Sequence, residues 1–153
     1  MYIRLSLFDR FKASAWAVLA PVFPYVRDAL LRLGIIRHNI RQNFLIGYLA
    51  PGRSVQGLIE HLKTHHGFCD HRIAWVDSDE IIGLRKLANF HFQYHLRVFM
   101  DREIRVHFEY TPESRPFDHL AEACFEDRRE EFLRFLEDWI VVAFGKEKDP
   151  QSS

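Results

Sequence analysis

The sequence has few of the features that assign a small protein to a function. It contains two cysteines, Cys69 and Cys124, in 153 residues, too few for the disulfide framework of a small secreted domain. We therefore expect both to be reduced thiols in a cytoplasmic protein. A Gly-rich phosphate loop, a Gly-x-Ser-x-Gly nucleophile elbow and a paired Cys-x-x-Cys motif are also missing. These absences argue against the most easily recognised nucleotide-binding, hydrolase and redox classes.

Long apolar runs and an excess of charge are missing too. The most apolar stretch, residues 13–23, is far shorter than the roughly 20 residues that a membrane span needs. Asp9 before it and Pro21 and Pro24 at its end do not fit a secretion signal. The 21 basic and 21 acidic residues balance, which removes the main charge signature of nucleic-acid binding. The sequence thus predicts no membrane partner and gives little support for RNA.

The hydrophobic pattern predicts a single α+β domain over residues 1–145, followed by a flexible polar tail over 146–153. Pro21 and Pro24 divide residues 1–36 into two helices, which we expect to pack on the domain. Helical spacing also predicts a helix between Ser54 and Gly67 and two more over 118–124 and 126–144. Strands are expected at 43–49, 72–76, 81–87, 90–99 and 103–110. The predicted fold is an antiparallel sheet of four to five strands with helices packed on one face.

The last two predicted strands define a register. Even-numbered positions are apolar and odd-numbered positions are mostly polar, which is typical of an antiparallel pair with one buried and one polar face. A three-residue loop, Met100-Asp101-Arg102, then places His95 opposite His107 and Arg97 opposite Arg105. Arg102 occupies the loop position that favours a left-handed conformation and usually glycine. We therefore expect replacement of Arg102 by glycine to be neutral or stabilising.

This register places like charges opposite each other on the polar face, where they destabilise a sheet unless something offsets them. Neighbouring acids and water are one solution, and a solvated face needs no ligand. The other is an anion, because arginine forks and imidazoles bind phosphate or carboxylate groups. The second interpretation predicts a small binding module for phosphate, RNA or an acidic peptide. The predicted ligand-binding residues are Gln93, His95, Arg97, Arg105, His107 and Glu109.

The same residues allow an enzymatic alternative. His95 and His107 could act as general base and general acid, while Arg97 stabilises a pentavalent phosphate. That arrangement would make a metal-independent phosphodiesterase or ribonuclease, and it requires room for a substrate between the two histidines. Whether the protein is an enzyme is left open by the sequence.

The chain holds nine histidines, and a second group of them lies in the segment His61-x-x-x-His65-His66-x-x-Cys69-x-His71. His61 and His65 are one helical turn apart and could share a zinc or nickel ion, with Cys69 or His71 completing the site. The spacing matches no standard zinc motif. A polar helix face followed by a loop explains the same pattern without a metal.

The N-terminal helices suggest a third class of function. Basic residues near Phe8, Phe11 and Trp16 could lie on a membrane surface or in a partner's groove. We expect instead that these side chains pack on the protein's own sheet, since an exposed stripe would form an unusually large apolar patch.

Overall fold

A computed structural model describes residues 6–35, 44–71, 79–115 and 126–143 of the chain. The predicted strand at 72–76, the helix at 118–124 and the tail at 146–153 lie outside these ranges. In chain order the elements are α1 (Leu7–Leu19), α2 (Phe23–Arg32), β1 (Phe44–Leu49), α3 (Val55–His66), β2 (Cys69–Asp70), β3 (Glu80–Leu87), β4 (Phe92–Phe99), β5 (Glu103–Tyr110), α5 (Arg129–Leu136), the 3-10 helix η1 (Glu137–Trp139) and β6 (Ile140–Val142).

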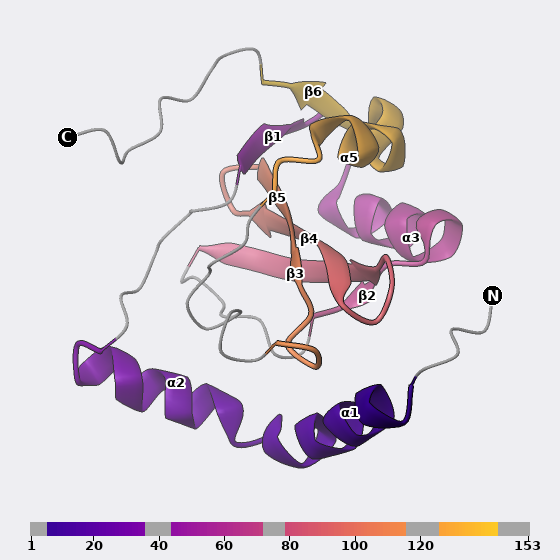
Figure 1. Ribbon diagram of the computed structural model, residues 1–153. Helices are drawn as coiled ribbons and strands as arrows, with labels where there is room; N and C mark the ends of the chain where they lie inside the picture. Colours follow the sequence, from indigo (N-terminus) through magenta and orange to yellow (C-terminus); the bar gives the residue numbers. More distant parts are fainter. Residues whose placement is uncertain (1–5, 36–43, 72–78, 116–125, 144–153) are drawn as a thin grey trace.

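The strands form one antiparallel sheet in the order β2-β3-β4-β5-β1-β6 (Figure 1). The α+β class with an antiparallel sheet is confirmed, but the sheet has six strands rather than four to five. One additional strand, β6, lies where we predicted the last third of a helix over 126–144. That prediction was wrong because the helix ends at Leu136, where Glu137 adopts a φ of 45°. The β-branched residues Ile140, Val141 and Val142 then pair with β1.

Gly47 permits the close approach of β6 to β1. A Cβ atom at this position would lie 2.4 Å from the carbonyl oxygen of Val141, so a side chain could fit only if the backbone of β6 moved. The edge pairing of β6 therefore depends on a residue without a side chain.

The signals that begin and end α3 are confirmed. The Ser54 hydroxyl accepts a hydrogen bond from the backbone N–H of Gly57 at 3.1 Å, and Gly67 ends α3 in the left-handed conformation with φ 70°. Gly34 has the same φ after α2. These short-range signals fix the ends of α3, which carries two histidines of interest below.

One cluster of buried apolar side chains contains residues of the sheet and of two helices. Its helical members are Leu58, Ile59 and Leu62 from α3 and Phe132 and Leu136 from α5. The strands contribute even-numbered residues of β4 and β5 together with residues of the neighbouring strands. These strand residues include Ile46, Leu49, Leu84, Tyr94, Leu96, Val98, Ile104, Val106, Phe108 and Ile140.

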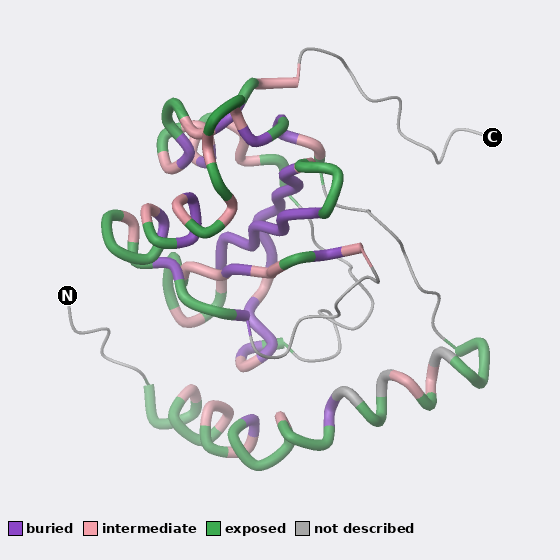
Figure 2. The backbone as a smooth tube through the Cα atoms, turned by 180° about the vertical axis from the view of Figure 1, so that it is seen from behind, coloured by how far each residue is buried: buried purple, intermediate pink, exposed green. Residues whose placement is uncertain are grey.

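Helices α1 and α2 lie along one side of the molecule, away from α3 and α5 (Figures 1 and 2). Trp16 and Phe23 are buried and contact each other edge to face. Of the side chains that we expected to pack on the sheet, Phe8 and Phe11 are 66% and 70% exposed, whereas Trp16 is buried. In the part of the chain that the structure describes, every helix is too short or too polar to cross a bilayer.

Candidate functional site

The predicted register of the last hairpin is confirmed. His95 lies opposite His107, Arg97 opposite Arg105, and Gln93 opposite Glu109. Arg102 has a φ of 72°, as its place in the three-residue loop requires. The six residues predicted to bind a ligand therefore lie side by side on one face of β4 and β5.

That face is buried and is not the solvated surface that period-two alternation alone suggests. All six residues are at most 8% exposed, and β4 and β5 form a continuous buried stretch in Figure 2. Burial removes the screening by water, so each charge on this face requires a close partner within the protein. The buried polar set on and beside it comprises His71, Glu80, Gln93, His95, Arg97, Arg105, His107, Glu109, Thr111 and Ser114.

The arginines of this face have carboxylate partners. Arg97 pairs with Glu80, and Nε of Arg105 lies 2.9 Å from the Glu103 carboxylate. Arg85 belongs to β3 and lies opposite His95 of β4. It pairs with Glu113 at 2.9 Å. Glu109 is a fourth carboxylate on this face. Among these described residues, three guanidinium groups and four carboxylates sum to −1 when the histidines are neutral, which leaves no excess of positive charge for an additional anion.

Three histidines and Glu109 form a connected network. His71 Nδ1 lies 3.2 Å from His95 Nε2, and His95 Nδ1 lies 3.2 Å from His107 Nε2. The same two atoms, His95 Nδ1 and His107 Nε2, lie 3.5 and 3.1 Å from the Glu109 oxygens. Glu109 also accepts a hydrogen bond from Gln93 Nε2 at 2.7 Å.

One assignment of protons accounts for the contacts with Glu109. His71 Nδ1–H donates to His95 Nε2, while His95 Nδ1–H and His107 Nε2–H both face the Glu109 carboxylate. The 3.2 Å distance between His95 Nδ1 and His107 Nε2 is then a contact of two donors and not a hydrogen bond. Burial lowers the pKa of His95 from 6.5 to about 4, although the nearby Glu109 opposes the shift. His95 is therefore neutral at pH 7. Hydrogen bonds and contacts with one carboxylate thus link the buried members of the network to one another.

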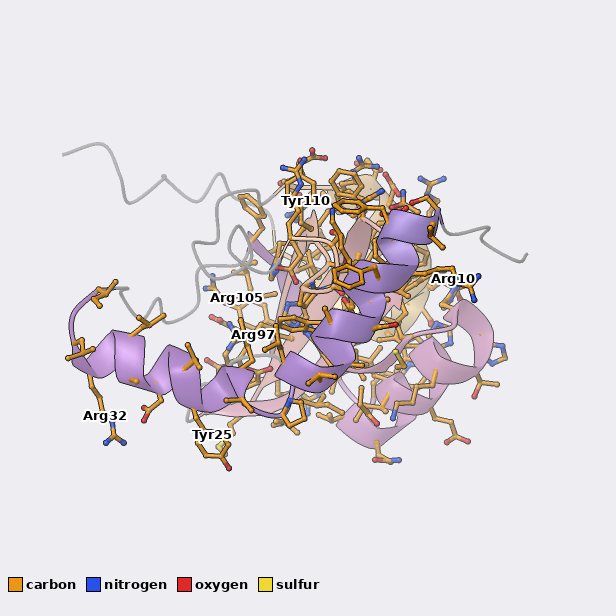
Figure 3. The ribbon with its side chains drawn as sticks, turned by 60° about the horizontal axis from the view of Figure 1, so that its bottom comes forward. Arg10, Tyr25, Arg32, Arg97, Arg105 and Tyr110 are labelled. Atoms are coloured by element: carbon orange, nitrogen blue, oxygen red, sulfur yellow. The ribbon has the colours of Figure 1, made fainter. Side chains whose placement is uncertain are left out.

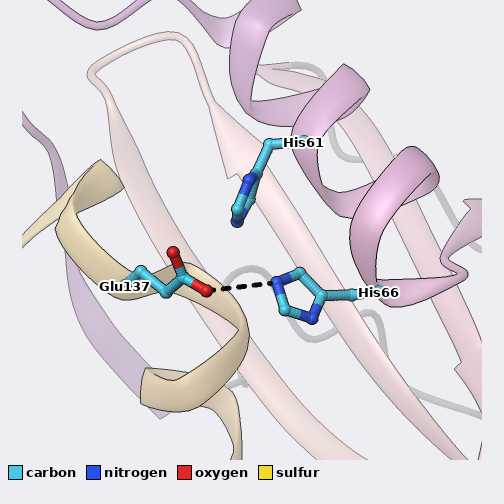
Figure 4. A group of neighbouring side chains, drawn as sticks. All are labelled: His61, His66 and Glu137. Carbon is cyan, nitrogen blue, oxygen red and sulfur yellow. Dashed lines mark ion pairs between the residues drawn. The ribbon is translucent and has the colours of Figure 1, made fainter.

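A different group of histidines lies at the end of α3. His61 and His66 come from α3 and Glu137 comes from η1, and Figure 4 shows all three side chains converging. One ligand atom from each residue lies within 4.8 Å of the others. The two imidazole rings are 4.9 Å apart at their centroids. Two imidazoles and one carboxylate are ligands that zinc and related transition metals accept.

The hydrogen bonds of this group leave ligand atoms available. His61 Nε2–H donates to the backbone carbonyl oxygen of Phe135 at 3.0 Å. In the neutral ring, Nδ1 then carries no proton and its lone pair can bind a metal. His66 Nε2 is buried and has no hydrogen-bond partner in the described structure. Its nearest acid oxygen, Glu137 Oε1, lies 3.7 Å away. A buried ring nitrogen without a partner is costly unless a ligand satisfies it.

The surroundings also favour the form of His66 that binds metals. Burial lowers the pKa of His66, and the neighbouring His61 lowers it further, while Glu137 acts in the opposite direction. Glu137 holds a φ of 45°, a conformation that non-glycine residues adopt at a cost and that is found at functional sites. Neutral His66 and ionised Glu137 are the protonation states that coordinate a divalent cation.

The four residues predicted to share a metal lie in different places. His61 belongs to the group at the end of α3. The His65 ring lies 5.4 Å from the His61 ring and is exposed, and Cys69 is an exposed free thiol on β2. His71 belongs to the buried network with His95. Of these four residues, the structure brings only His61 into the group at the end of α3, where the second imidazole is that of His66 and not that of His65.

His66 and Glu137 are the residues that the sequence-based prediction missed. His66 is the last residue of α3. The four-residue spacing of His61 and His65 does not indicate that the His66 side chain belongs to the same group. Glu137 comes from an element 71 positions after His66, and no local pattern connects the two. A comparison of the chain with protein-family models, with curated proteins and with solved structures found no match.

Proposed function

We propose that the protein binds a divalent transition-metal ion through His61, His66 and Glu137. The observation that carries this proposal is the buried Nε2 of His66, which has no hydrogen-bond partner among the described residues and lies 3.7 Å from the Glu137 carboxylate. A metal ion would satisfy this nitrogen and balance the charge of Glu137. A metal-binding module was the second alternative from the sequence, with a different set of ligands.

The chemistry of the three ligands suits a zinc-class ion. Metal–nitrogen bonds of about 2.0–2.1 Å in a tetrahedral site place ligand atoms roughly 3.3 Å apart. The three ligand atoms lie within 4.8 Å of one another, so modest side-chain rotations bring them to that spacing. His61 Nε2 contacts the Phe135 carbonyl oxygen at 3.0 Å, and outer partners of this kind commonly orient ligating histidines. Three protein ligands leave a fourth position for water or for an exogenous ligand.

The buried network around Glu109 is the weaker candidate for a metal. His71, His95 and Glu109 also have ligand atoms within 4.8 Å of one another. His71 Nδ1 and both ring nitrogens of His95 already contact other members of the network within 3.5 Å. Binding through these atoms would have to break the contacts in a buried environment, whereas His66 Nε2 has no hydrogen-bond partner among the described residues.

The two other functions expected from the sequence are less well supported. An anionic ligand on Gln93, His95, Arg97, Arg105, His107 and Glu109 would have to displace carboxylates that already contact the guanidinium groups. A phosphodiesterase that uses His95, His107 and Arg97 needs a substrate between the histidines, whose nitrogens are 3.2 Å apart. Anion binding and phosphodiester cleavage therefore serve as competing outcomes in the experiments. We retain the expectation of a cytoplasmic protein.

The test is zinc binding by untagged protein, measured by calorimetric titration and by elemental analysis after dialysis. We expect about one zinc ion per chain. His66→Ala and Glu137→Gln should each weaken binding by roughly tenfold or more, because each removes one of three ligands. His65→Ala is the matched control, since it removes an exposed histidine from the adjacent position of the same helix.

The outcome that overturns the proposal is equally specific. Zinc binding that is unchanged in both His66→Ala and Glu137→Gln would assign the metal to another site. If the wild-type protein binds neither zinc nor nickel nor copper, the proposed metal-binding function is wrong. Circular dichroism of each variant establishes that a loss of binding is not a loss of fold.

A further inference from the structure

The N-terminal helices leave an extended apolar surface without a partner in the part of the chain that the structure describes. Ten large apolar side chains between residues 7 and 35 are at least 46% exposed. A typical monomer does not expose a continuous apolar surface of this size without a function for it. These side chains are Leu7, Phe8, Phe11, Val18, Leu19, Val22, Tyr25, Val26, Leu33 and Ile35.

The exposed side chains of α1 share one face. At about 100° per residue, Leu7, Phe8, Phe11, Val18 and Leu19 fall within roughly one third of the helix circumference. Trp16, the buried residue of α1, lies outside that sector. The exposed apolar face is therefore directed away from the contacts that hold α1.

Basic side chains flank this face. Arg10 lies on one side and Lys12 on the other, while the acidic Asp9 lies farther round the helix. Lys12 Nζ is 4.7 Å from the centre of the Phe8 ring, and Arg10 lines a shallow groove together with Leu7, Phe8, Phe11 and Ser14. An apolar face between cationic side chains is typical of helices that lie in a membrane interface.

The second helix continues the pattern. Tyr25, Val26 and Leu33 are exposed, and Figure 3 shows the side chains of Tyr25 and Arg32 extending from α2 in the same direction, away from the sheet. Tyrosine and arginine are residues that anchor a helix at the boundary between headgroups and acyl chains.

The charge of the chain is distributed unevenly. Residues 1–37 contain six basic and two acidic residues, a net charge of +4. Because the whole chain is neutral, the remaining residues carry −4. The apolar surface thus lies in the cationic part of a neutral protein, which complements an anionic surface and repels an identical helix pair from a second copy.

We propose that α1 and α2 bind the surface of a bilayer that contains anionic lipids. The helices lie in the plane of the interface, with Phe8, Phe11 and Val18 inserted among the acyl chains and Arg10 and Lys12 at the phosphate groups. This assignment reverses the expectation from the sequence that a membrane is not a partner. It is independent of the proposed metal site, which is formed by α3 and η1.

The experiment is flotation of the full chain with vesicles of phosphatidylcholine alone and of phosphatidylcholine with 30% phosphatidylserine, in the presence of a chelator. We expect binding to the anionic vesicles, at least fivefold above that to the neutral ones, and a decrease with salt. Phe8→Glu/Phe11→Glu should reduce binding to background. Arg10→Gln/Lys12→Gln should weaken it by about fivefold for each charge removed.

The matched control is Ile81→Glu/Met100→Glu, which places the same two charges at exposed apolar residues of β3 and of the loop between β4 and β5 and should leave binding unchanged. The proposal is overturned if the wild type fails to float with anionic vesicles. It is also overturned if the chain is a dimer in solution that Phe8→Glu/Phe11→Glu dissociates, since a second copy would then cover the surface. Equal binding to neutral and anionic vesicles would overturn the electrostatic part.

Discussion

The imidazole rings of His95 and His107 lie directly opposite each other on β4 and β5, with Nδ1 of His95 3.2 Å from Nε2 of His107. Both nitrogens also face Glu109. This contact explains how a buried sheet face tolerates three histidines and a carboxylate. Both rings face one buried carboxylate, and burial lowers the pKa of His95 to about 4, so that this ring is neutral at pH 7.

The first prediction concerns the pH dependence of stability. Burial lowers the pKa of folded His95 to about 4 from 6.5, so between these values the unfolded chain binds a proton that the folded chain does not. The free energy of unfolding should be fully maintained above pH 6.5 and fall as the pH decreases toward 4, by of order 3 kcal/mol from this group. Urea unfolding at a series of pH values measures the slope.

His95→Gln should flatten that slope even if it lowers stability overall. His65→Gln, which removes an exposed histidine outside the network, should keep the wild-type slope. An equally steep decrease in the His95→Gln variant would mean that another group is responsible for the acid sensitivity.

The second prediction concerns Glu109. Its carboxylate accepts from Gln93 Nε2 and faces N–H groups of His95 and His107. In Glu109→Gln the new amide N–H₂ group would point at existing donors, so we expect a loss of about 2–4 kcal/mol in the free energy of unfolding. Glu126→Gln, an exposed carboxylate paired with Arg128, should cost less than about 1 kcal/mol. Similar losses in the two variants would rule out the network as a source of stability.

The sequence predicted those parts of the molecule that depend on short-range rules. The register that pairs His95 with His107 follows from alternation and from the loop that contains Arg102, and the ends of α3 follow from Ser54 and Gly67. Burial of the polar face could not be predicted, because alternation says that two faces differ but not that one of them meets water. The partnership of His66 with Glu137 depends on where two distant elements pack.

The third prediction modifies the expected effect of Arg102→Gly. Arg102 has a φ of 72°, and relief of that conformation by glycine is worth about 1 kcal/mol. The guanidinium group also donates hydrogen bonds to the carbonyl oxygens of Leu49, Ala50 and Arg53, at 3.3, 2.9 and 3.2 Å. Glycine removes both the strain and these contacts, so we no longer expect a stabilised protein.

Arg102→Ala separates the two effects, because alanine loses the same contacts and keeps the strain. Thermal and urea unfolding should show Arg102→Gly more stable than Arg102→Ala by about 1 kcal/mol, with both at or below the wild type. If alanine is tolerated as well as glycine, the left-handed conformation of the loop is not a cost in the folded protein.

The fourth prediction concerns Gly47, where a Cβ would lie 2.4 Å from the carbonyl oxygen of Val141. Gly47→Ala should separate β6 from β1 and lower stability by several kcal/mol, because the obstructing atom belongs to the backbone. Gly57→Ala is the comparison, since its nearest neighbour is the Trp139 ring at 2.9 Å, which can rotate. We expect faster amide exchange in β6 for Gly47→Ala alone. Unchanged exchange there would contradict the close packing of the two strands.

The last prediction joins the sheet to α5. The hydroxyl of Tyr94 on β4 donates a hydrogen bond to the carboxylate of Glu131 on α5, and Arg128 pairs with the same carboxylate at 3.1 Å. These contacts, the Tyr94 hydroxyl foremost, lower the pKa of Glu131, and burial opposes them. The resulting stability is present above the ordinary pKa of a glutamate and is lost as the pH falls through the lowered value.

Tyr94→Phe removes the hydroxyl and keeps the ring in the core, so it should cost about 1–2 kcal/mol near pH 7. The cost should shrink in acid as Glu131 becomes protonated. In a double-mutant cycle with Glu131→Gln, the two losses should add to more than the loss in the double variant, because both single substitutions remove the same hydrogen bond. Strictly additive losses, or a cost of Tyr94→Phe that stays constant from pH 7 to pH 3, would show that the two side chains do not act on each other.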